Sequence, residues 1–275
     1  MNIITYQQLY KAIDKLTYDI AYSNIQIDAV VPALRSGMIP AFRIAEKLHL
    51  PIMVENTLYG GYRLSKGRKV KNILIVDDSI NSGRSMYDEI IKYKDDYNVY
   101  TSAVIASFSS KSKVNFYTLV VDQPRMFEWN MFNSTNTNKV MFDMDGVICI
   151  NPRVFDNDGE SYQNEIKNLP RLFVPSYAVH SIVTNRIERW RPETEAWLKS
   201  NGVTFGSLIM QQYSTAVERR ATSDAGEYKA KFYQNSDAVL FIESDIAQAN
   251  TIYNLTKKPV YCVDSSTLLG VKDEA

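Results

Sequence analysis

The sequence predicts an α/β fold with two doubly wound parallel-sheet (Rossmann-like) domains in tandem. Short apolar runs of strand length alternate with amphipathic stretches of helix length, a rhythm typical of parallel sheets with helices on both faces. The 275 residues exceed the usual single-domain size of about 100 to 150. The expected strands form two groups, at 27–31, 72–77 and 102–107, and at 139–145, 180–185, 207–210, 238–243 and 260–264.

A polar segment separates these two groups of strands. The sequence VDQPRMFEWNMFNSTNTNK ends in an Asn, Ser and Thr cluster without hydrophobic periodicity, which is the composition of a linker. We therefore expect a first domain at 1–130, a linker at 131–138 and a second domain at 139–275.

Several helix ends carry local signals, each directly after a strand and a turn. Pro40 can start the helix PAFRIAEKLHL, because proline is tolerated in a first turn. Ser85 can open the helix SMYDEIIKYK. Pro192 and Gly202 bound a helix over about 191–200, since glycine can take the left-handed position that ends it.

The composition excludes several classes of protein. With 45% hydrophobic and 23% charged residues, the chain can bury cores and is not of the disordered type. Its 31 basic and 31 acidic residues cancel, so no net charge attracts nucleic acid, which is not an expected partner. No apolar run reaches the roughly 18 residues of a membrane span, and the first residues lack a signal-peptide pattern. We expect a cytoplasmic protein with no membrane partner.

The first group of strands contains two acids followed by a Ser/Gly-rich turn. The run ILIVDDSINSGRSM leads from a strand through Asp77 and Asp78 into a helix start, where strand ends and helix amino termini form ligand crevices in open sheets. Backbone amides of this turn can wrap a phosphate, because Gly83 permits a tight turn. The two acids can accept hydrogen bonds from vicinal hydroxyls, so a sugar phosphate satisfies both features. The turn consists of Asn81, Ser82, Gly83, Arg84 and Ser85.

A second strand-to-helix turn contains Arg35, Ser36 and Gly37. Arginine offers several fixed donors to phosphate oxygens, and glycine allows close backbone approach. Between the two turns lies the basic, glycine-containing segment 55–72. It is either a mobile flap that excludes water or a solvated hairpin.

Together these turns resemble the type I phosphoribosyltransferases. The resemblance implies that Asp77 and Asp78 contact the ribose hydroxyls of phosphoribosyl pyrophosphate (PRPP), that residues 81–85 hold its 5-phosphate, and that residues 35–37 bind its diphosphate. The implied reaction is displacement at the anomeric carbon, in which Mg²⁺ neutralises the leaving group and no catalytic His is needed. It also implies a small-molecule acceptor, which no sequence pattern identifies, and a homodimer is an expected assembly.

Two positions depart from that family's usual pattern. Asn81 stands where Thr is commoner, and Arg84 stands where a small residue is commoner. The details of the phosphate loop are therefore left open.

The second group of strands begins with KVMFDMDGVICINP, which places Asp143 and Asp145 at a strand end. The spacing of two points both side chains to one side, and two close carboxylates need a cation such as Mg²⁺. The pattern resembles the first motif of the haloacid dehalogenase-like (HAD) phosphatases. The resemblance implies that Asp143 is the nucleophile that forms an aspartyl phosphate and that Asp145 is the general acid and base.

Three later segments resemble the remaining motifs of that family. The resemblance implies that Thr184, with Asn185 beside it, binds the transferring phosphoryl group, and that Lys229 holds the charges of nucleophile and phosphate. It implies Asp143, Asp145 and Glu243 as magnesium ligands. The family often has an acid where Ser244 stands, so Asp245 or a water completes the metal shell. The intervals between motifs are too short for a large extra domain, so we expect a minimal cap.

Together the two resemblances predict a bifunctional enzyme. The first domain would transfer 5-phosphoribosyl from PRPP to an acceptor, and the second would hydrolyse a phosphomonoester, with the 5-phosphate of the product as one candidate. Two alternatives stay open: a nucleobase salvage transferase with an independent nucleotidase, or a PRPP-sensing regulatory protein.

Overall fold

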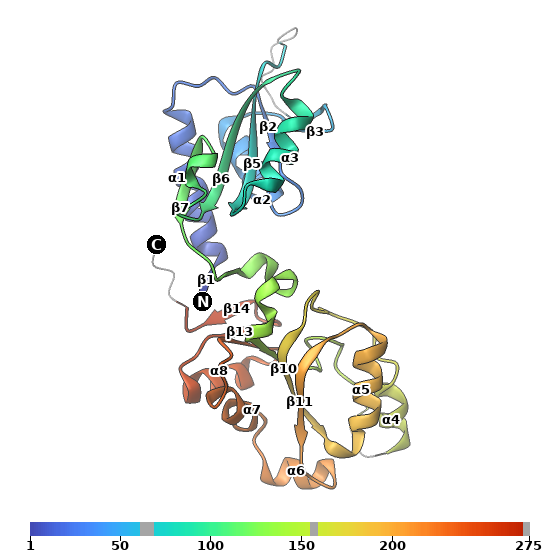
Figure 1. Ribbon diagram of the computed structural model, residues 1–275. Coiled ribbons are helices and arrows are strands. Elements are labelled where there is room, and N and C mark those ends of the chain that lie inside the picture. The colour runs from blue at the N-terminus through green and yellow to red at the C-terminus, as the bar shows by residue number, and fades with distance from the viewer. Residues whose placement is uncertain (61–68, 155–158, 272–275) are drawn as a thin grey trace. The chain divides into compact units, whose positions relative to one another are not determined.

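A computed structural model describes residues 1–60, 69–154 and 159–271. The chain divides into two compact units, Met1–Arg125 (unit 1) and Met126–Lys272 (unit 2), each described by itself (Figure 1). Each unit contains a six-stranded sheet that is parallel except for one edge strand. The predicted fold class, α/β with two parallel-sheet units in tandem, is confirmed.

Unit 1 is built on a sheet with the strand order β4-β3-β2-β5-β6-β7. Its strands are β2 (Ala29–Pro32), β3 (Ile52–Val54), β4 (Thr57–Tyr59), β5 (Asn72–Ile80), β6 (Asn98–Ala106) and β7 (Phe116–Val120). Its helices are α1 (Tyr6–Ala21), α2 (Met38–Leu48), α3 (Arg84–Tyr93) and the 3-10 turn η1 (Lys111–Lys113). Two short strands, β1 (Asn2–Ile4) and β8 (Arg125–Phe127), stand outside the large sheets.

The order of strands in unit 1 reverses between β2 and β5. The chain leaves β2 through α2 to β3 on one side, and leaves β5 through α3 to β6 on the other. The two strands pair in parallel from Ala29↔Ile73 to Pro32↔Val76. Such a switch point opens a crevice at the carboxyl ends of the two strands, because their connections diverge.

Alternation along these strands supplies the core of unit 1. Val31 and Ile75 pack with Met86 and Tyr93 of α3 in one buried cluster, as expected when successive side chains point to opposite faces. Helix α2 contacts β2, β3 and β5. Parallel crossovers are right-handed almost without exception. Because the crossovers β2-α2-β3 and β5-α3-β6 proceed in opposite directions across the sheet, α2 and α3 cover opposite faces.

Unit 2 has the strand order β11-β10-β9-β12-β13-β14 (Figure 1, green through yellow to red). Its strands are β9 (Val140–Phe142), β10 (Val179–Ile187), β11 (Phe205–Gln211), β12 (Leu240–Glu243), β13 (Val260–Cys262) and β14 (Thr267–Leu269). Its α-helices are α4 (Glu160–Ile166), α5 (Arg191–Ser200), α6 (Ala216–Thr222), α7 (Ala225–Gln234) and α8 (Ile246–Thr256). Its 3-10 turns are η2 (Glu128–Asn133), η3 (Thr135–Lys139) and η4 (Glu188–Trp190).

The same kind of reversal occurs in unit 2, between β9 and β12. From β9 the chain proceeds outward to β10 and β11, whereas from β12 it proceeds through α8 to β13 in the other direction. The two central strands pair from Leu240↔Val140 to Ile242↔Phe142. The carboxyl ends of β9 and β12 are therefore the second switch point.

The division between the units lies upstream of the predicted linker. Residues 131–138 belong to unit 2, where the backbone N–H of Ser176 donates to the carbonyl of Phe132 and the Thr137 hydroxyl donates to the carbonyl of Ala178. The polar composition of this segment reflects short 3-10 turns, in which Ser, Thr and Asn satisfy backbone groups locally, rather than a solvated connector.

Two predicted helix starts were displaced. Helix α2 begins at Met38 and α3 at Arg84, before Pro40 and Ser85. The reason is that the glycines at 37 and 83 occupy the N-cap positions.

Other expectations of local structure agree with the observed elements. Helix α5 spans Arg191–Ser200 with Pro192 in its first turn, and Gly202 has a φ of 72°. Both cysteines are buried and unpaired. Within the described ranges, no helix has the length and apolar character needed to cross a membrane.

The close packing at the switch point of unit 1 requires glycine at position 37. A Cβ atom there would lie 2.6 Å from the carbonyl oxygen of Val76 and nearer still to that of Ala33. We expect Gly37→Ala to lower the free energy of unfolding by about 2–3 kcal/mol, measured by urea denaturation. Gly60 has a positive φ but nothing within 4 Å of its Cβ position, so Gly60→Ala should cost about 1 kcal/mol. Equal losses would contradict the steric explanation.

Candidate functional site

The turn after β2 holds the first group of predicted site residues of unit 1. Gly37 precedes α2, and its close approach to Val76 places the turn against the end of β5. Arg35 is exposed and Ser36 is half-buried. The turn that carries Arg35 therefore lies against the end of β5, and the Arg35 side chain is exposed.

The turn after β5 holds the second group. Asp77 and Asp78 are in the last part of β5, and the exposed residues Asn81, Ser82, Arg84 and Ser85 surround the start of α3. Gly83 has a φ of 84°, the left-handed conformation that glycine adopts without strain. The first amides of α3 thus face an exposed loop, which is the arrangement that binds anions.

Two basic residues that the sequence analysis missed also border this turn. Lys113 of η1 donates to the Ser82 carbonyl at 2.7 Å, and its aliphatic part lies against Gly83. Arg125, which is 4% exposed, donates to the carbonyl of Ile80 at 3.0 Å. These contacts hold the two carbonyls at the N-terminal side of the turn. No local signal marks either residue, because each reaches the loop from a distant part of the chain.

Asp77 of unit 1 lies in a buried and acidic environment. Burial, with the neighbouring carboxylate of Asp78, raises the pKa of Asp77 to about 8. The backbone N–H of Asp78 donates to Asp77 Oδ1 at 2.8 Å. A carboxyl that is mostly protonated near neutral pH can donate as well as accept a hydrogen bond, which is compatible with hydroxyl groups as ligands.

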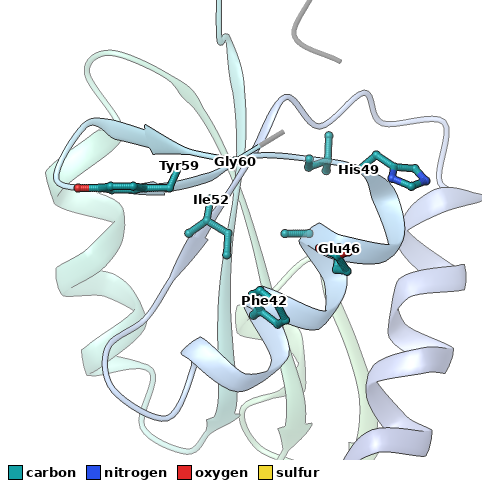
Figure 2. A pocket seen from close by; sticks show the side chains of 8 residues that line it. Phe42, Glu46, His49, Ile52, Tyr59 and Gly60 are labelled. Carbon is teal, nitrogen blue, oxygen red and sulfur yellow. The ribbon is translucent and has the colours of Figure 1, made fainter. Parts of the chain in front are cut away.

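A separate pocket of unit 1 lies away from these residues. Phe42 and Glu46 of α2, with His49 directly after it, line this pocket together with Ile52 and Tyr59 (Figure 2). Its volume is about 240 Å³. It lies beside the edge strand β4 and contains none of the predicted PRPP-binding residues. The residues 61–68, at the centre of the predicted flap, lie outside the described residues.

In unit 2 the predicted nucleophile lies beside the predicted lysine. Asp143 directly follows β9 and is 5% exposed, whereas Lys229 and Glu243 are fully buried. The Nζ atom of Lys229 lies 2.8 Å from Asp143 Oδ2 and 2.6 Å from Glu243 Oε2. Residues from β9, α7 and β12 therefore converge at the switch point.

This cluster buries two carboxylates and one ammonium group, so acidic groups are in excess. Burial and the carboxylate of Glu243 raise the pKa of Asp143 well above its usual value, against the opposing effect of Lys229. Burial also disfavours the charge on Lys229, but Asp143 and Glu243 together raise its pKa. The ammonium group of Lys229 thus forms ion pairs with two carboxylates.

Asp145 is oriented differently from Asp143. Its carboxylate accepts two hydrogen bonds from Arg186, from Nε at 2.9 Å and from Nη2 at 2.6 Å, and the Arg186 side chain is 1% exposed. Arg186 also donates to Thr194 of α5. Bidentate pairing of this kind fixes a carboxylate in one orientation.

Hydrogen bonds connect side chains of β10, β11 and α8 in this part of unit 2. Thr184 is buried, and its hydroxyl accepts from the backbone N–H of Arg186. Asn185 accepts from Gln211 at 3.1 Å and donates to Gln248 Oε1 at 3.2 Å. Both residues lie in the second half of β10, and Asn185 is linked through Gln248 to Lys229.

The predicted set of three metal-binding carboxylates is not brought together as one group. Among the described residues, no cluster of three or more His, Cys, Asp or Glu side chains could hold a metal ion. The reason is local: Arg186 occupies the carboxylate of Asp145, while Asp143 and Glu243 meet at Lys229. The donor chemistry nevertheless fits a hard cation. Three carboxylates face two cationic side chains. The main-chain carbonyl of Asp145 accepts from the Ser244 hydroxyl at 3.2 Å, next to Glu243. Asp143, Glu243 and this carbonyl are oxygen ligands of the kind Mg²⁺ prefers.

The sequence analysis missed Arg186, Gln211 and Gln248 in this site. Arg186 could have been found, because it is two positions after Thr184 on the same strand and therefore points to the same face. Gln248 is in the first turn of α8, where its backbone N–H donates to the capping Asp245. No sequence signal connects Gln211 with the site.

Comparisons with known proteins give a fold likeness for part of the chain. No family model and no curated protein matches it. The xanthine-guanine-hypoxanthine phosphoribosyltransferase of Helicobacter pylori is 19% identical with a TM-score of 0.38, covering 46% of this chain and 92% of that one. The purine phosphoribosyltransferase of Pyrococcus horikoshii Ot3 has the same identity and coverage and a TM-score of 0.37.

A third solved structure is similar over both units. The Pnkp1/Rnl/Hen1 complex is 13% identical with a TM-score of 0.36, covering 96% of this chain and 87% of that chain. These neighbours include phosphoribosyltransferases that cover about half of this chain. Identities and TM-scores at this level identify no family, so the function is inferred from the site residues.

The raised pKa of Asp77 predicts a pH-dependent stability. The folded protein keeps the Asp77 proton up to about pH 8, whereas the unfolded chain loses it near pH 4. The wild-type free energy of unfolding should therefore fall across that window. Asp77→Asn removes this effect, so we expect the variant to gain roughly 2 kcal/mol on the wild type between about pH 5 and pH 8.

Urea denaturation at several pH values would measure this gain. Asp88→Asn, which changes an exposed acid of α3, is the matched control. A difference between the Asp77→Asn variant and the wild type that stays constant over the whole pH range would contradict the assignment.

Proposed function

We propose that the chain is a bifunctional enzyme. Unit 1 transfers 5-phosphoribosyl from PRPP to a small-molecule acceptor and releases diphosphate, and unit 2 hydrolyses a phosphomonoester. One observation supports this proposal: in each unit the predicted acids directly follow or end a central strand at the switch point of its own sheet, where open α/β sheets bind ligands.

In unit 1 the two turns would hold opposite ends of PRPP. The pairing of Pro32 with Val76 sets the turn at residues 35–37 beside Asp77 and Asp78, so one sugar could reach both. Residues 81–85 would bind the 5-phosphate through the amides at the start of α3. The aspartates would accept the ribose hydroxyls, and Arg35, Ser36 and Gly37 would bind the diphosphate. Bound Mg²⁺ would supply charge neutralisation of the leaving diphosphate.

The transfer itself would need positioning rather than a protein nucleophile. As the bond from the anomeric carbon to the diphosphate oxygen breaks, an acceptor atom would form the new bond, and the electron pair of the broken bond would leave with diphosphate. The fixed donors of the two turns would stabilise the separating charges.

In unit 2 Asp143 would attack the phosphorus of a phosphomonoester. The bond to the leaving oxygen would break while the bond to Asp143 forms, and Asp145 would give a proton to that oxygen. Asp145 would then take a proton from the water that hydrolyses the aspartyl phosphate and releases orthophosphate. Lys229 would balance the charge of the nucleophile, and Thr184 would contact the phosphoryl oxygens. Asp143, Glu243 and the carbonyl of Asp145 would hold Mg²⁺, which supplies charge neutralisation at phosphorus.

The fusion suggests that the two reactions follow each other. A phosphoriboside made by unit 1 carries a 5-phosphate, which is a phosphomonoester of the kind that unit 2 would hydrolyse. Purified protein supplied with PRPP and a panel of nucleobases should therefore release diphosphate and then orthophosphate from the adduct. Diphosphate release without orthophosphate from the adduct would contradict the coupling and favour a salvage transferase with an independent nucleotidase.

Two variants should separate the activities. We expect Asp78→Asn to lower diphosphate release about 100-fold and to spare hydrolysis of a phosphomonoester. Asp143→Asn should lower phosphomonoester hydrolysis at least 1,000-fold, on the order expected for loss of a nucleophile, and spare diphosphate release. Both rates can be followed by coupled detection of the released anion.

Asp88→Asn and Asp237→Asn change exposed acids in the two units and serve as matched controls. Equal loss of both activities in either site variant would show that the sites are not separate. PRPP binding without turnover of any acceptor would instead favour a regulatory protein.

A further inference from the structure

The hydrogen bonds of Lys229 leave no proton free for a substrate. Its ammonium group has three N–H bonds, and Nζ contacts Asp143 Oδ2, Glu243 Oε2 and Gln248 Oε1 at 2.8, 2.6 and 2.9 Å. The side chain is fully buried. If Lys229 is to contact a phosphoryl group, one of these three acceptors has to be replaced.

Gln248 is the acceptor that can be replaced. Asp143 and Glu243 are buried carboxylates at the ends of β9 and β12, and separating either from Lys229 would leave a buried charge unpaired, which is costly. Gln248 is neutral, half-buried and carried by the first turn of α8. An amide side chain can turn toward solvent at the cost of ordinary hydrogen bonds.

A second donor converges on the same oxygen. Asn185 Nδ2 donates to Gln248 Oε1 at 3.2 Å. The other end of the Asn185 amide accepts from Gln211 Nε2 at 3.1 Å, which turns the NH₂ group of Asn185 toward Gln248. One oxygen atom thus accepts from an ammonium and an amide, beside the predicted nucleophile.

We infer that Gln248 Oε1 occupies a phosphoryl-oxygen position between Lys229 and Asn185, and that a bound phosphoryl group displaces it. This inference rests on the proposed phosphatase site of unit 2. Gln248 then competes with phosphate from within the chain: in the free protein its oxygen accepts the hydrogen bonds of Lys229 and Asn185 and keeps both side chains in place. Its amide must leave before Lys229 and Asn185 can bind a phosphoryl oxygen, so it sets the affinity of the site for phosphate.

A competing role and a purely supporting role for Gln248 predict opposite changes in phosphate affinity when its side chain is removed. If Gln248 competes, its removal strengthens phosphate binding. The apparent dissociation constant equals the intrinsic one divided by the fraction of protein in which the donors are free, and removing Gln248 increases that fraction. If Gln248 only holds Lys229 in place, its removal weakens phosphate binding.

Calorimetric titration with inorganic phosphate in a magnesium chloride buffer tests this difference. We expect Gln248→Ala to lower the dissociation constant about 3- to 10-fold, which corresponds to one displaced hydrogen bond. Gln248→Asn, which withdraws the oxygen by one methylene, should lower it by less. Gln248→Glu should raise it more than about 10-fold, because a carboxylate would bind Lys229 more tightly and repel phosphate.

Asn250→Ala changes an exposed residue of the same helix and should leave phosphate binding unaltered. Gln248→Ala should fold, because the cap of α8 uses only the backbone N–H of Gln248 and alanine favours helices; thermal denaturation checks this. Unchanged or weaker binding by a folded Gln248→Ala variant, or no binding by both it and the wild type, would overturn the inference.

Phosphomonoester turnover is measured separately from binding. Tighter phosphate binding by Gln248→Ala without turnover by the wild type would contradict the proposed hydrolysis and leave this inference standing. Turnover that depends on Asp143, together with unchanged phosphate binding in Gln248→Ala, would support the proposed hydrolysis and overturn the inference about Gln248.

Discussion

The divergence of chain connections between two central strands is the constraint on which both sites depend. In a parallel sheet the loops at the carboxyl ends cover the strand tips, except where neighbouring connections leave in opposite directions. This happens between β2 and β5 in unit 1 and between β9 and β12 in unit 2. In each case the uncovered strand ends carry acids: Asp77 and Asp78 in one, Asp143 and Glu243 in the other. Fold topology thus decides where the chemistry can occur.

Charge balance explains how unit 2 tolerates so many acids in a small volume. Asp143 and Glu243 share Lys229, and Asp145 pairs with Arg186. Removing one partner from such a buried set is costly, because it leaves a desolvated charge without compensation. The set still carries one more carboxylate than cation, which favours binding of a positively charged group. In unit 1, burial and the neighbouring carboxylate of Asp78 raise the pKa of Asp77 to about 8.

Much of this organisation could be predicted from the sequence, because strand ends and turns have local signals. The runs ending at Asp78 and Asp145 mark strand tips by their apolar residues, and Gly37 and Gly83 mark the turns. The groups that orient the acids could not be predicted in the same way. Lys113, Arg125 and Gln248 reach the sites from residues far along the chain, and only folding brings them near. The segment 131–138 was misleading for a related reason, since its polar residues satisfy backbone groups in 3-10 turns.

The buried cysteines give the protein a practical property. Burial raises the pKa of the Cys149 thiol, and Cys262 is fully buried in the core, so neither is expected to react quickly with alkylating reagents. The natural cysteines are therefore not expected to take up thiol-reactive spectroscopic labels. A cysteine introduced on an exposed helix of each unit would carry a probe pair without removing any natural residue of the core, and the distance between the two units could then be followed while each binds its ligand.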